Sequence, residues 1–224
     1  MQNEKEAWDV TAEMLGNDSV TWSDHWSYNF RNDPKRLAFV LSRYKFAAKM
    51  GSQGRTILEL GCGEGIGATI LAESALSYTG IDLDDAAILS ARKNLNGEKF
   101  KFIYDDFMGK LLGTFQTVVS LDVVEHIYPE HEAVYFETIL QNLSQDGIAI
   151  IGTPNVTAAP YASTASNIGH VNLFSPARLK EALEQYFYNV FPFGMNDETM
   201  HTGYAPMCHY AICVACNRRE AWKK

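Results

Sequence analysis

The sequence concentrates chemically capable side chains in the stretch SLDVVEHI, residues 120–127. Asp122, Glu125 and His126 follow the apolar run QTVVSL, which predicts a buried strand. Carboxylate oxygens and imidazole nitrogens bind divalent metal ions, and an imidazole also accepts a proton near neutral pH. The stretch therefore predicts metal binding or proton transfer at the end of a strand. A structural role is a third interpretation, in which Glu125 caps the next helix and His126 packs.

A second histidine, His170, is expected to return to the same strand end. It lies in a Ser/Thr/Ala-rich segment, residues 153–175, which we interpret as a long loop between a strand and a helix. Loops of this length inside a domain are usually functional or mobile. His126 and His170 are thus the candidate catalytic bases. The candidate metal ligands are Asp122, Glu125, His126 and His170.

A glycine-rich turn indicates where a ligand approaches the backbone. In LELGCGEGIG, Glu59 ends an apolar run, and Gly61, Gly63 and Gly65 lead into a predicted helix. Glycines permit a tight turn and close contact with a ligand. A dinucleotide-binding fingerprint needs a glycine where Ile66 stands, which disfavours a nicotinamide cofactor.

Acidic residues also end the next two predicted strands. Asp82 lies 23 residues after Glu59, and the pair Asp105 and Asp106 precedes Phe107. In a doubly wound sheet, an acid at the position of Asp82 can accept hydrogen bonds from ribose hydroxyls. The later acids can accept from an adenine amino group while the aromatic ring covers the base. Together these strand ends predict a nucleoside-containing cofactor.

The elements that position these residues alternate along the chain. Apolar strands alternating with amphipathic helices predict a mostly parallel sheet covered on both faces. The predicted strands are residues 56–61, 78–82, 100–106, 116–122 and 148–153. The predicted helices are residues 33–50, 65–75, 84–95 and 129–147.

The two ends of the chain differ from this pattern. Pro176 begins a predicted helix, and the strands 188–193 and 209–216 follow with only a loop between them, so they are expected to pair antiparallel. Residues 1–32 lack clear periodicity and are predicted to form an irregular extension or a lid, with residues 33–224 as a single domain. Further candidate substrate contacts are Trp22, Trp26, Tyr28, Asn196, Asp197, Glu198, His201 and His209.

These motifs in this order resemble the class I S-adenosylmethionine-dependent methyltransferases from residue 56 to about residue 215. The resemblance rests on ILELGCGEGIGATILAE, YTGIDLDD, YDDF, LDVVEHI and IGTPN. It implies an α/β, Rossmann-like, doubly wound fold with a mostly parallel seven-stranded sheet and an antiparallel final strand. It also implies that Glu59, Gly61 and Gly63 flank the methionine part of S-adenosylmethionine, Asp82 binds the ribose, and Asp106 with Phe107 binds the adenine. The other expected cofactor-binding residues are Cys62, Leu83, Asp105 and Leu121.

The stretch from Asp122 to His126, with His170 after TPN, is similar to the metal-dependent O-methyltransferases of small-RNA terminal ribose. Its first half also resembles the ubiquinone-pathway O-methyltransferases. Both groups usually carry Glu where this chain has Asp122. The resemblance implies a divalent metal, Mg or Mn, as one alternative, and a metal-free site with a histidine base as the other.

Charge and composition indicate which classes of ligand the protein binds. The chain has 224 residues, a formal net charge of −8 and no run of Lys or Arg, so a long polyphosphate is a disfavoured ligand. A small-molecule or sugar acceptor is expected instead of nucleic acid. No stretch is apolar enough to indicate export or membrane insertion, so we expect a cytoplasmic protein. No feature indicates an oligomeric state.

We therefore expect an S-adenosylmethionine-dependent methyltransferase that acts on an oxygen of a sugar or another polyhydroxylated small molecule. An RNA-terminal ribose O-methyltransferase is one alternative. A non-catalytic S-adenosylmethionine-binding module is another. The pair Cys213 and Cys216 lies in a strand pattern that places the two thiols on opposite faces, which disfavours a metal or redox role.

Overall fold

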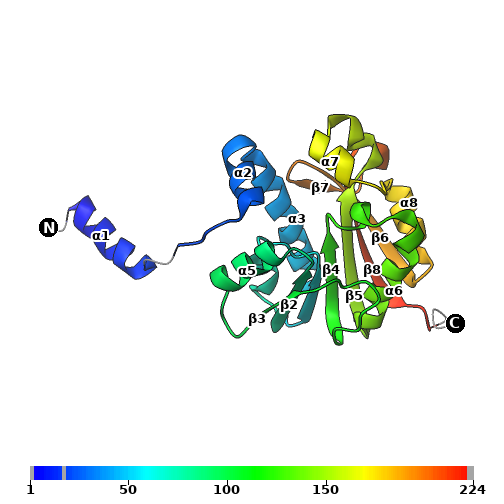
Figure 1. Ribbon diagram of the computed structural model, residues 1–224, viewed down its shortest axis with the longest axis horizontal. Coiled ribbons are helices and arrows are strands. Elements are labelled where there is room, and N and C mark those ends of the chain that lie inside the picture. Colours follow the sequence, from blue (N-terminus) through cyan, green and yellow to red (C-terminus); the bar gives the residue numbers. More distant parts are fainter. Residues whose placement is uncertain (1–2, 17–18, 221–224) are drawn as a thin grey trace.

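The computed structural model describes residues 3–16 and 19–220 and is built around an eight-stranded sheet (Figure 1). The strand order is β3-β2-β1-β4-β5-β8-β6-β7. The strands β1 to β5 are mutually parallel, whereas β8 runs antiparallel between β5 and β6. The strands are β1 Thr56–Leu60, β2 Ser77–Asp82, β3 Phe100–Tyr104, β4 Phe115–Leu121, β5 Leu143–Pro154, β6 Phe187–Asn196, β7 Thr199–His201 and β8 Tyr210–Arg218.

Helices cover both faces of this sheet, which confirms the predicted α/β, doubly wound fold. The α-helices are α1 Glu4–Leu15, α2 Asp24–Asn32, α3 Lys35–Gly51, α4 Ala68–Ala72, α5 Asp85–Asn94, α6 Glu132–Asn142, α7 Thr164–Gly169 and α8 Pro176–Glu184. The short 3-10 helices are η1 Val124–His126, η2 Pro129–His131, η3 Val156–Tyr161 and η4 Ala205–Met207. Helices α3, α4 and α5 contribute buried residues to one core cluster, and α6 and α8 contribute to the other.

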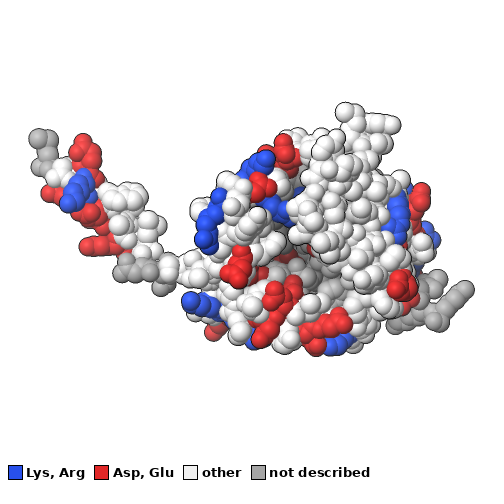
Figure 2. Space-filling model, turned by 45° about the horizontal axis from the view of Figure 1, so that its top comes forward, with Lys and Arg blue, Asp and Glu red and all other residues white. Residues whose placement is uncertain are grey.

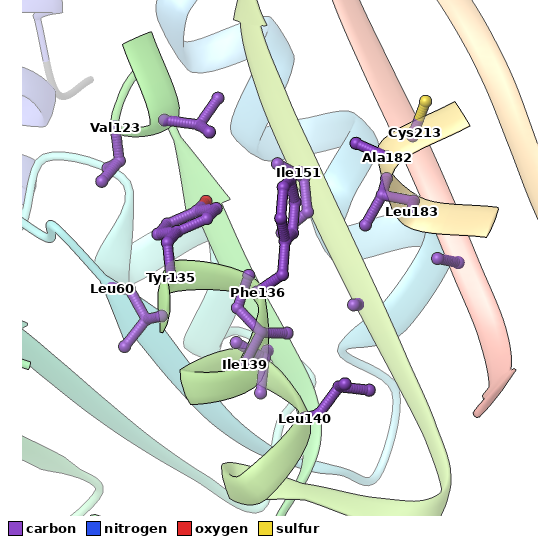
Figure 3. Packing of buried hydrophobic residues seen from close by; sticks show 14 of the residues in the cluster. Leu60, Val123, Tyr135, Phe136, Ile139, Leu140, Ile151, Ala182, Leu183 and Cys213 are labelled. Carbon is purple, nitrogen blue, oxygen red and sulfur yellow. The ribbon is translucent and has the colours of Figure 1, made fainter. Parts of the chain in front are cut away.

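The packing of α6 illustrates how these faces form. Tyr135, Phe136 and Ile139 recur at helical spacing and are almost fully buried. They belong to one cluster with Ile151 of β5 and Leu183 of α8 (Figure 3). Full burial of such side chains contributes about 1.5–3 kcal/mol each. This layer holds the carboxyl ends of β4 and β5 in place.

The sheet has one more strand than the seven that were predicted. Thr199–His201 pairs antiparallel with the end of β6, inside a segment that was interpreted as a loop. Asp197 makes the turn with φ of 49°, a conformation that Asp tolerates better than most residues. Three residues are too few to show the alternation by which a strand is predicted.

The helix predicted at 129–147 is wrong at both ends. It begins at Glu132, after the turn η2, and stops at Asn142, from which β5 follows directly. At this end of the helix the Asn142 carboxamide binds the loop before β4, accepting from the backbone N–H of Leu112 at 2.6 Å and donating to Lys110 O at 2.7 Å. These partners are 30 and 32 positions away in the sequence.

The extension 1–32 is not irregular, because it contains α1 and α2. Asn3 and Glu6 form a reciprocal capping box at the start of α1. Helix α1 has no buried residue and lies apart from the sheet (Figure 1). Helix α2 packs beside α3 and buries Asn29.

The segment 153–175, which was predicted to be a long loop, also contains regular secondary structure, namely η3 and α7. Asn155 caps the first and Ser163 caps the second through their side-chain oxygens.

On the face in Figure 2, basic and acidic side chains are interspersed, without a continuous basic surface. None of the helices within residues 3–16 and 19–220 is long and apolar enough to cross a lipid bilayer.

Candidate active site

Two adjacent cavities open at the carboxyl ends of the parallel strands, the edge at which open α/β sheets bind ligands. The smaller, of about 280 Å³, is lined by Gly61, Asp82, Leu83, Asp106, Phe107, Met108, Asp122, Val123, His126 and Ile127. The larger, of about 800 Å³, lies between α2, α3, β5, α7 and the β6–β8 end of the sheet. Asp122 and His126 line both cavities and therefore form their common wall.

The glycine-rich turn shapes the smaller cavity. Gly61 has φ of 75°, and a Cβ atom placed there would lie 2.4 Å from Val123 Cγ2. Gly63 has φ of 50° and open space where a side chain would be. Its N–H donates to Asp82 Oδ2 at 2.7 Å, and Asp84 N–H donates to Asp82 Oδ1 at 2.9 Å. The turn thus holds the Asp82 carboxylate at the cavity wall.

Half of the predicted cofactor residues line this cavity: Gly61, Asp82, Leu83, Asp106 and Phe107. Glu59, Cys62 and Leu121 are buried behind it. Asp105 points to solvent and pairs with Lys110 at 2.5 Å. Gly63 acts through its backbone, as described above.

Glu59 is an internal carboxyl group. It is 1% exposed and accepts a hydrogen bond from the Tyr78 hydroxyl. Burial raises its pKa to about 7, although the hydrogen bond from Tyr78 opposes the shift. The folded protein therefore favours the protonated form of Glu59 more than the unfolded chain does.

The raised pKa predicts a pH-dependent stability. The contribution of Glu59 is fully present below its ordinary pKa of 4.5 and is lost as pH rises to about 7. The loss is about 3 kcal/mol, at 1.36 kcal/mol per pKa unit. We expect Glu59→Gln to lose less stability than wild type between pH 5 and pH 8 in urea titrations. Equal losses in the two proteins would contradict this, and exposed Glu73→Gln is the control.

Asp122 occupies a strained position on the common wall. Its φ is 58°, and its N–H lies 2.9 Å from Gly152 O and 3.2 Å from the Tyr210 hydroxyl. Arg43 of α3 donates through Nη1 to both carboxylate oxygens, at 2.9 and 2.8 Å. The guanidinium lies 3.6 Å from the Tyr210 ring centroid. The Asp122 carboxylate is therefore paired with the Arg43 guanidinium and held by it.

Glu125 is fully buried beside this pair. Thr153 donates to its Oε2 at 2.9 Å, while Oε1 has no hydrogen-bond partner among the residues described. Burial, reinforced by the charge of Asp122, raises the pKa of Glu125 to about 8.

The two histidines lie together above Glu125. His126 Nδ1 is 2.8 Å from Gly169 O, and because a carbonyl only accepts, Nδ1 carries the proton in the neutral ring, whose Nε2 then has a free lone pair. The His126 and His170 ring centroids are 5.1 Å apart. Burial, followed by the charge of His126, lowers the pKa of His170. His170 is therefore predominantly neutral at pH 7.

Three of the four predicted metal ligands come together. One ligand atom each from Glu125, His126 and His170 lie within 4.8 Å of one another. Asp122 is not part of this group, because its carboxylate is bound by Arg43. The observed group thus contains three of the four predicted ligands.

The larger cavity is also lined by residues that were not predicted from the sequence. Arg36, Phe39 and Arg43 line it from α3, and His25 lines it from α2. The spacing of three and then four residues in a predicted helix indicated that the α3 side chains share a face. Nothing in the sequence indicated that this face points to the site.

Of the other candidate substrate contacts, Asp197 and His209 line the larger cavity. His201 instead accepts a hydrogen bond from Gly203 N–H at its Nδ1. Trp22 packs edge-on against Phe30. The remaining candidates, Trp26, Tyr28, Asn196 and Glu198, are absent from both cavity walls.

The fold agrees with comparisons to known proteins. The profile of the methyltransferase domain family matches residues 30–191, and the chain belongs to this family. It is therefore a member of the S-adenosylmethionine-dependent methyltransferases, as the resemblance implied.

Curated relatives match part of the chain. It is 29% identical over 144 residues to a probable S-adenosylmethionine-dependent methyltransferase of Mycolicibacterium smegmatis, covering 61% of this chain and 53% of that protein. It is 28% identical over 138 residues to the ubiquinone biosynthesis O-methyltransferase of Glaesserella parasuis, covering 58% and 56%. The matched region thus spans about half the length of each relative.

Solved structures show the same fold. The plantazolicin methyltransferase BpumL in complex with S-adenosylhomocysteine has a TM-score of 0.63 and 18% identity, covering 87% of this chain and 89% of that chain. A TehB-like methyltransferase of Corynebacterium glutamicum has a TM-score of 0.65 and 17% identity, covering 86% and 96%.

Proposed function

We propose that the protein transfers the methyl group of S-adenosylmethionine to a hydroxyl oxygen of a sugar or another polyhydroxylated small molecule. The observation that carries this proposal is the position of His126 on the wall between the two cavities, with Nε2 free to accept a proton. Transfer from a sulfonium needs an oriented nucleophile and removal of its proton.

The smaller cavity fits the cofactor. Asp82 offers carboxylate oxygens for ribose hydroxyls, and we infer that Asp106 and Phe107, which line the same cavity, bind the adenine. Gly63 leaves open space for the methionine part close to the backbone, while the missing side chain of Gly61 lets Val123 pack against the turn. When bound, S-adenosylmethionine supplies the electrophilic methyl group.

The larger cavity suits a small acceptor. Its walls combine polar groups, among them Asp33, Ser163 and His209, with apolar ones such as Phe39 and Leu173. A cavity of about 800 Å³ lies within the usual range for small-molecule sites. An oxygen acceptor is also supported by the relatives named as ubiquinone biosynthesis O-methyltransferases.

Within this site, His126 accepts the acceptor's hydroxyl proton at Nε2, and its Nδ1–H bond to Gly169 O holds the ring in that orientation. The neutral neighbour His170 adds no opposing positive charge. Arg43 holds the Asp122 carboxylate at the common wall of the two cavities, so that Asp122 is not part of the group formed by Glu125, His126 and His170.

The same cluster fits a divalent ion, because two imidazoles and one carboxylate with an unpartnered oxygen are a recognised donor set. Glu125, His126 and His170 would then hold Mg²⁺ or Mn²⁺, which would favour the alkoxide form of the acceptor. We favour the histidine base, because the bond between His126 Nδ1 and Gly169 O already orients the ring for that role.

The test is an acceptor screen run with and without a chelator. We expect methylated product, and release of S-adenosylhomocysteine, from neutral sugars or polyols, unchanged by the chelator. Loss of activity that Mg²⁺ or Mn²⁺ restores would assign the cluster to a metal. Product only from short RNA would indicate an RNA-terminal ribose enzyme, and cofactor binding without any product would indicate a non-catalytic module.

A further inference from the structure

Glu64 joins the glycine-rich turn to the N-terminal segment. It stands between Gly63 and Gly65 and is 5% exposed. Its carboxylate accepts two hydrogen bonds from Ser23, from N–H at 2.6 Å and from Oγ at 2.5 Å. Charge-assisted hydrogen bonds of this length are among the stronger ones in proteins. A residue 41 positions away is therefore fixed to the cofactor turn.

Thr21, two residues before Ser23, is hydrogen-bonded to α5. The Asn94 carboxamide accepts from Thr21 N–H at 3.2 Å and donates to Thr21 O at 2.9 Å. Ser90 Oγ lies 3.1 Å from Thr21 O and 3.3 Å from Glu64 Oε2. Residues 21–23 thus form a strap across the cofactor side of the molecule.

The strap leads directly into the wall of the acceptor cavity. Ser23 is the N-cap residue of α2, and His25, two residues later, lines the larger cavity. Trp26 packs against the same core cluster as Ile66, which follows the glycine turn. A displacement at Ser23 would therefore move this wall.

The glycine turn that holds the strap also borders the smaller cavity. The N–H of Gly63, adjacent to Glu64, donates to the Asp82 carboxylate. A ribose bound to Asp82 would lie against this contact and so restrict the turn. The position of Glu64 would then depend on the cofactor.

We propose that Glu64 is a positioning residue that couples cofactor binding at the glycine turn to the placement of α2 over the acceptor cavity. The coupling between the two ligands rests on the proposed function, whereas the attachment of α2 to the turn does not. Couplings between sites typically change affinity about 5- to 150-fold.

Hydrogen exchange of α2 amides tests this proposal in wild type, Glu64→Ala, Glu64→Gln and Ser23→Ala. We expect S-adenosylhomocysteine to slow α2 exchange in wild type. This protection is expected to be lost in Glu64→Ala and reduced in Ser23→Ala, with the cofactor Kd in calorimetry changed less than about fivefold. Glu64→Gln should restore it, since the amide can still accept from Ser23 N–H. Glu73→Ala is the exposed control.

Equal α2 protection in wild type and Glu64→Ala would overturn the proposal. So would faster α2 exchange that is matched throughout the sheet, because that reports general destabilisation. If wild type does not bind S-adenosylhomocysteine, the proposed function fails. The strap is then judged by the unliganded proteins, in which Glu64→Ala and Ser23→Ala must still exchange faster in α2 alone. Once an acceptor is known, Glu64→Ala should raise its KM more than it lowers kcat.

Discussion

Replacement of Asp82 by alanine is expected to weaken binding of S-adenosylhomocysteine about a hundredfold. The Asp82 carboxylate lines the smaller cavity and is oriented by the N–H groups of Gly63 and Asp84. Hydrogen bonds to a charged group contribute about 1.5–3 kcal/mol each, and about 1.4 kcal/mol is a factor of ten, so two ribose contacts account for this loss.

Isothermal titration calorimetry measures this effect directly. Asp85→Ala is the matched control, because Asp85 is an exposed carboxylate in the same loop-to-helix segment and lines neither cavity. We expect its affinity to equal that of wild type. An Asp82→Ala protein with wild-type affinity would contradict the assignment of the smaller cavity to the cofactor.

Replacement of His126 by alanine is expected to lower kcat by about 10² to 10⁴, the usual contribution of a general base. Cofactor affinity should fall much less, because His126 forms only one part of the smaller cavity's wall. His126→Gln should be nearly as inactive, since an amide cannot take up the proton at neutral pH. Rates of S-adenosylhomocysteine release at saturating cofactor give the comparison.

The control for His126 is His131→Ala, which removes an exposed histidine five positions later that lines neither cavity. It should retain wild-type kcat. His170→Ala is expected to have a smaller effect than His126→Ala, because His170 lines only the acceptor cavity. Full activity in His126→Ala would rule out His126 as the base.

Much of the lining of the smaller cavity could be predicted from sequence for a simple physical reason. Parallel strands place their carboxyl ends at one edge, so polar residues that directly follow apolar runs must lie close together. This logic located Asp82, Asp106 and Phe107 without knowledge of any side-chain contact, and the smaller cavity is lined by all three.

The acceptor half could be predicted only in part. The pairing of Arg43 with Asp122 joins residues 79 positions apart and depends on how α3 rotates against the sheet. Periodicity shows which side chains share a helix face, but it does not show what that face contacts. For the same reason the sequence placed Asp122 in the metal cluster, whereas the structure gives it a cationic partner.

The segments around the acceptor show a second limit. Helix α2 and the helical turns between β5 and α8 have only six to nine residues each, too few to show the apolar periodicity by which longer elements are predicted. Their positions are set by side-chain contacts such as Ser23 with Glu64 and His126 with Gly169. Such contacts follow from the fold and are not encoded in local sequence.

A crystal structure with bound S-adenosylhomocysteine tests the central claim most directly, namely that the two cavities hold cofactor and acceptor and meet at Asp122 and His126. We expect the ribose to bind Asp82, the adenine to lie beside Asp106 and Phe107, and the sulfur to lie at the common wall, where it is exposed to the larger cavity. A ligand in the larger cavity alone, or a sulfur directed away from His126, would contradict it.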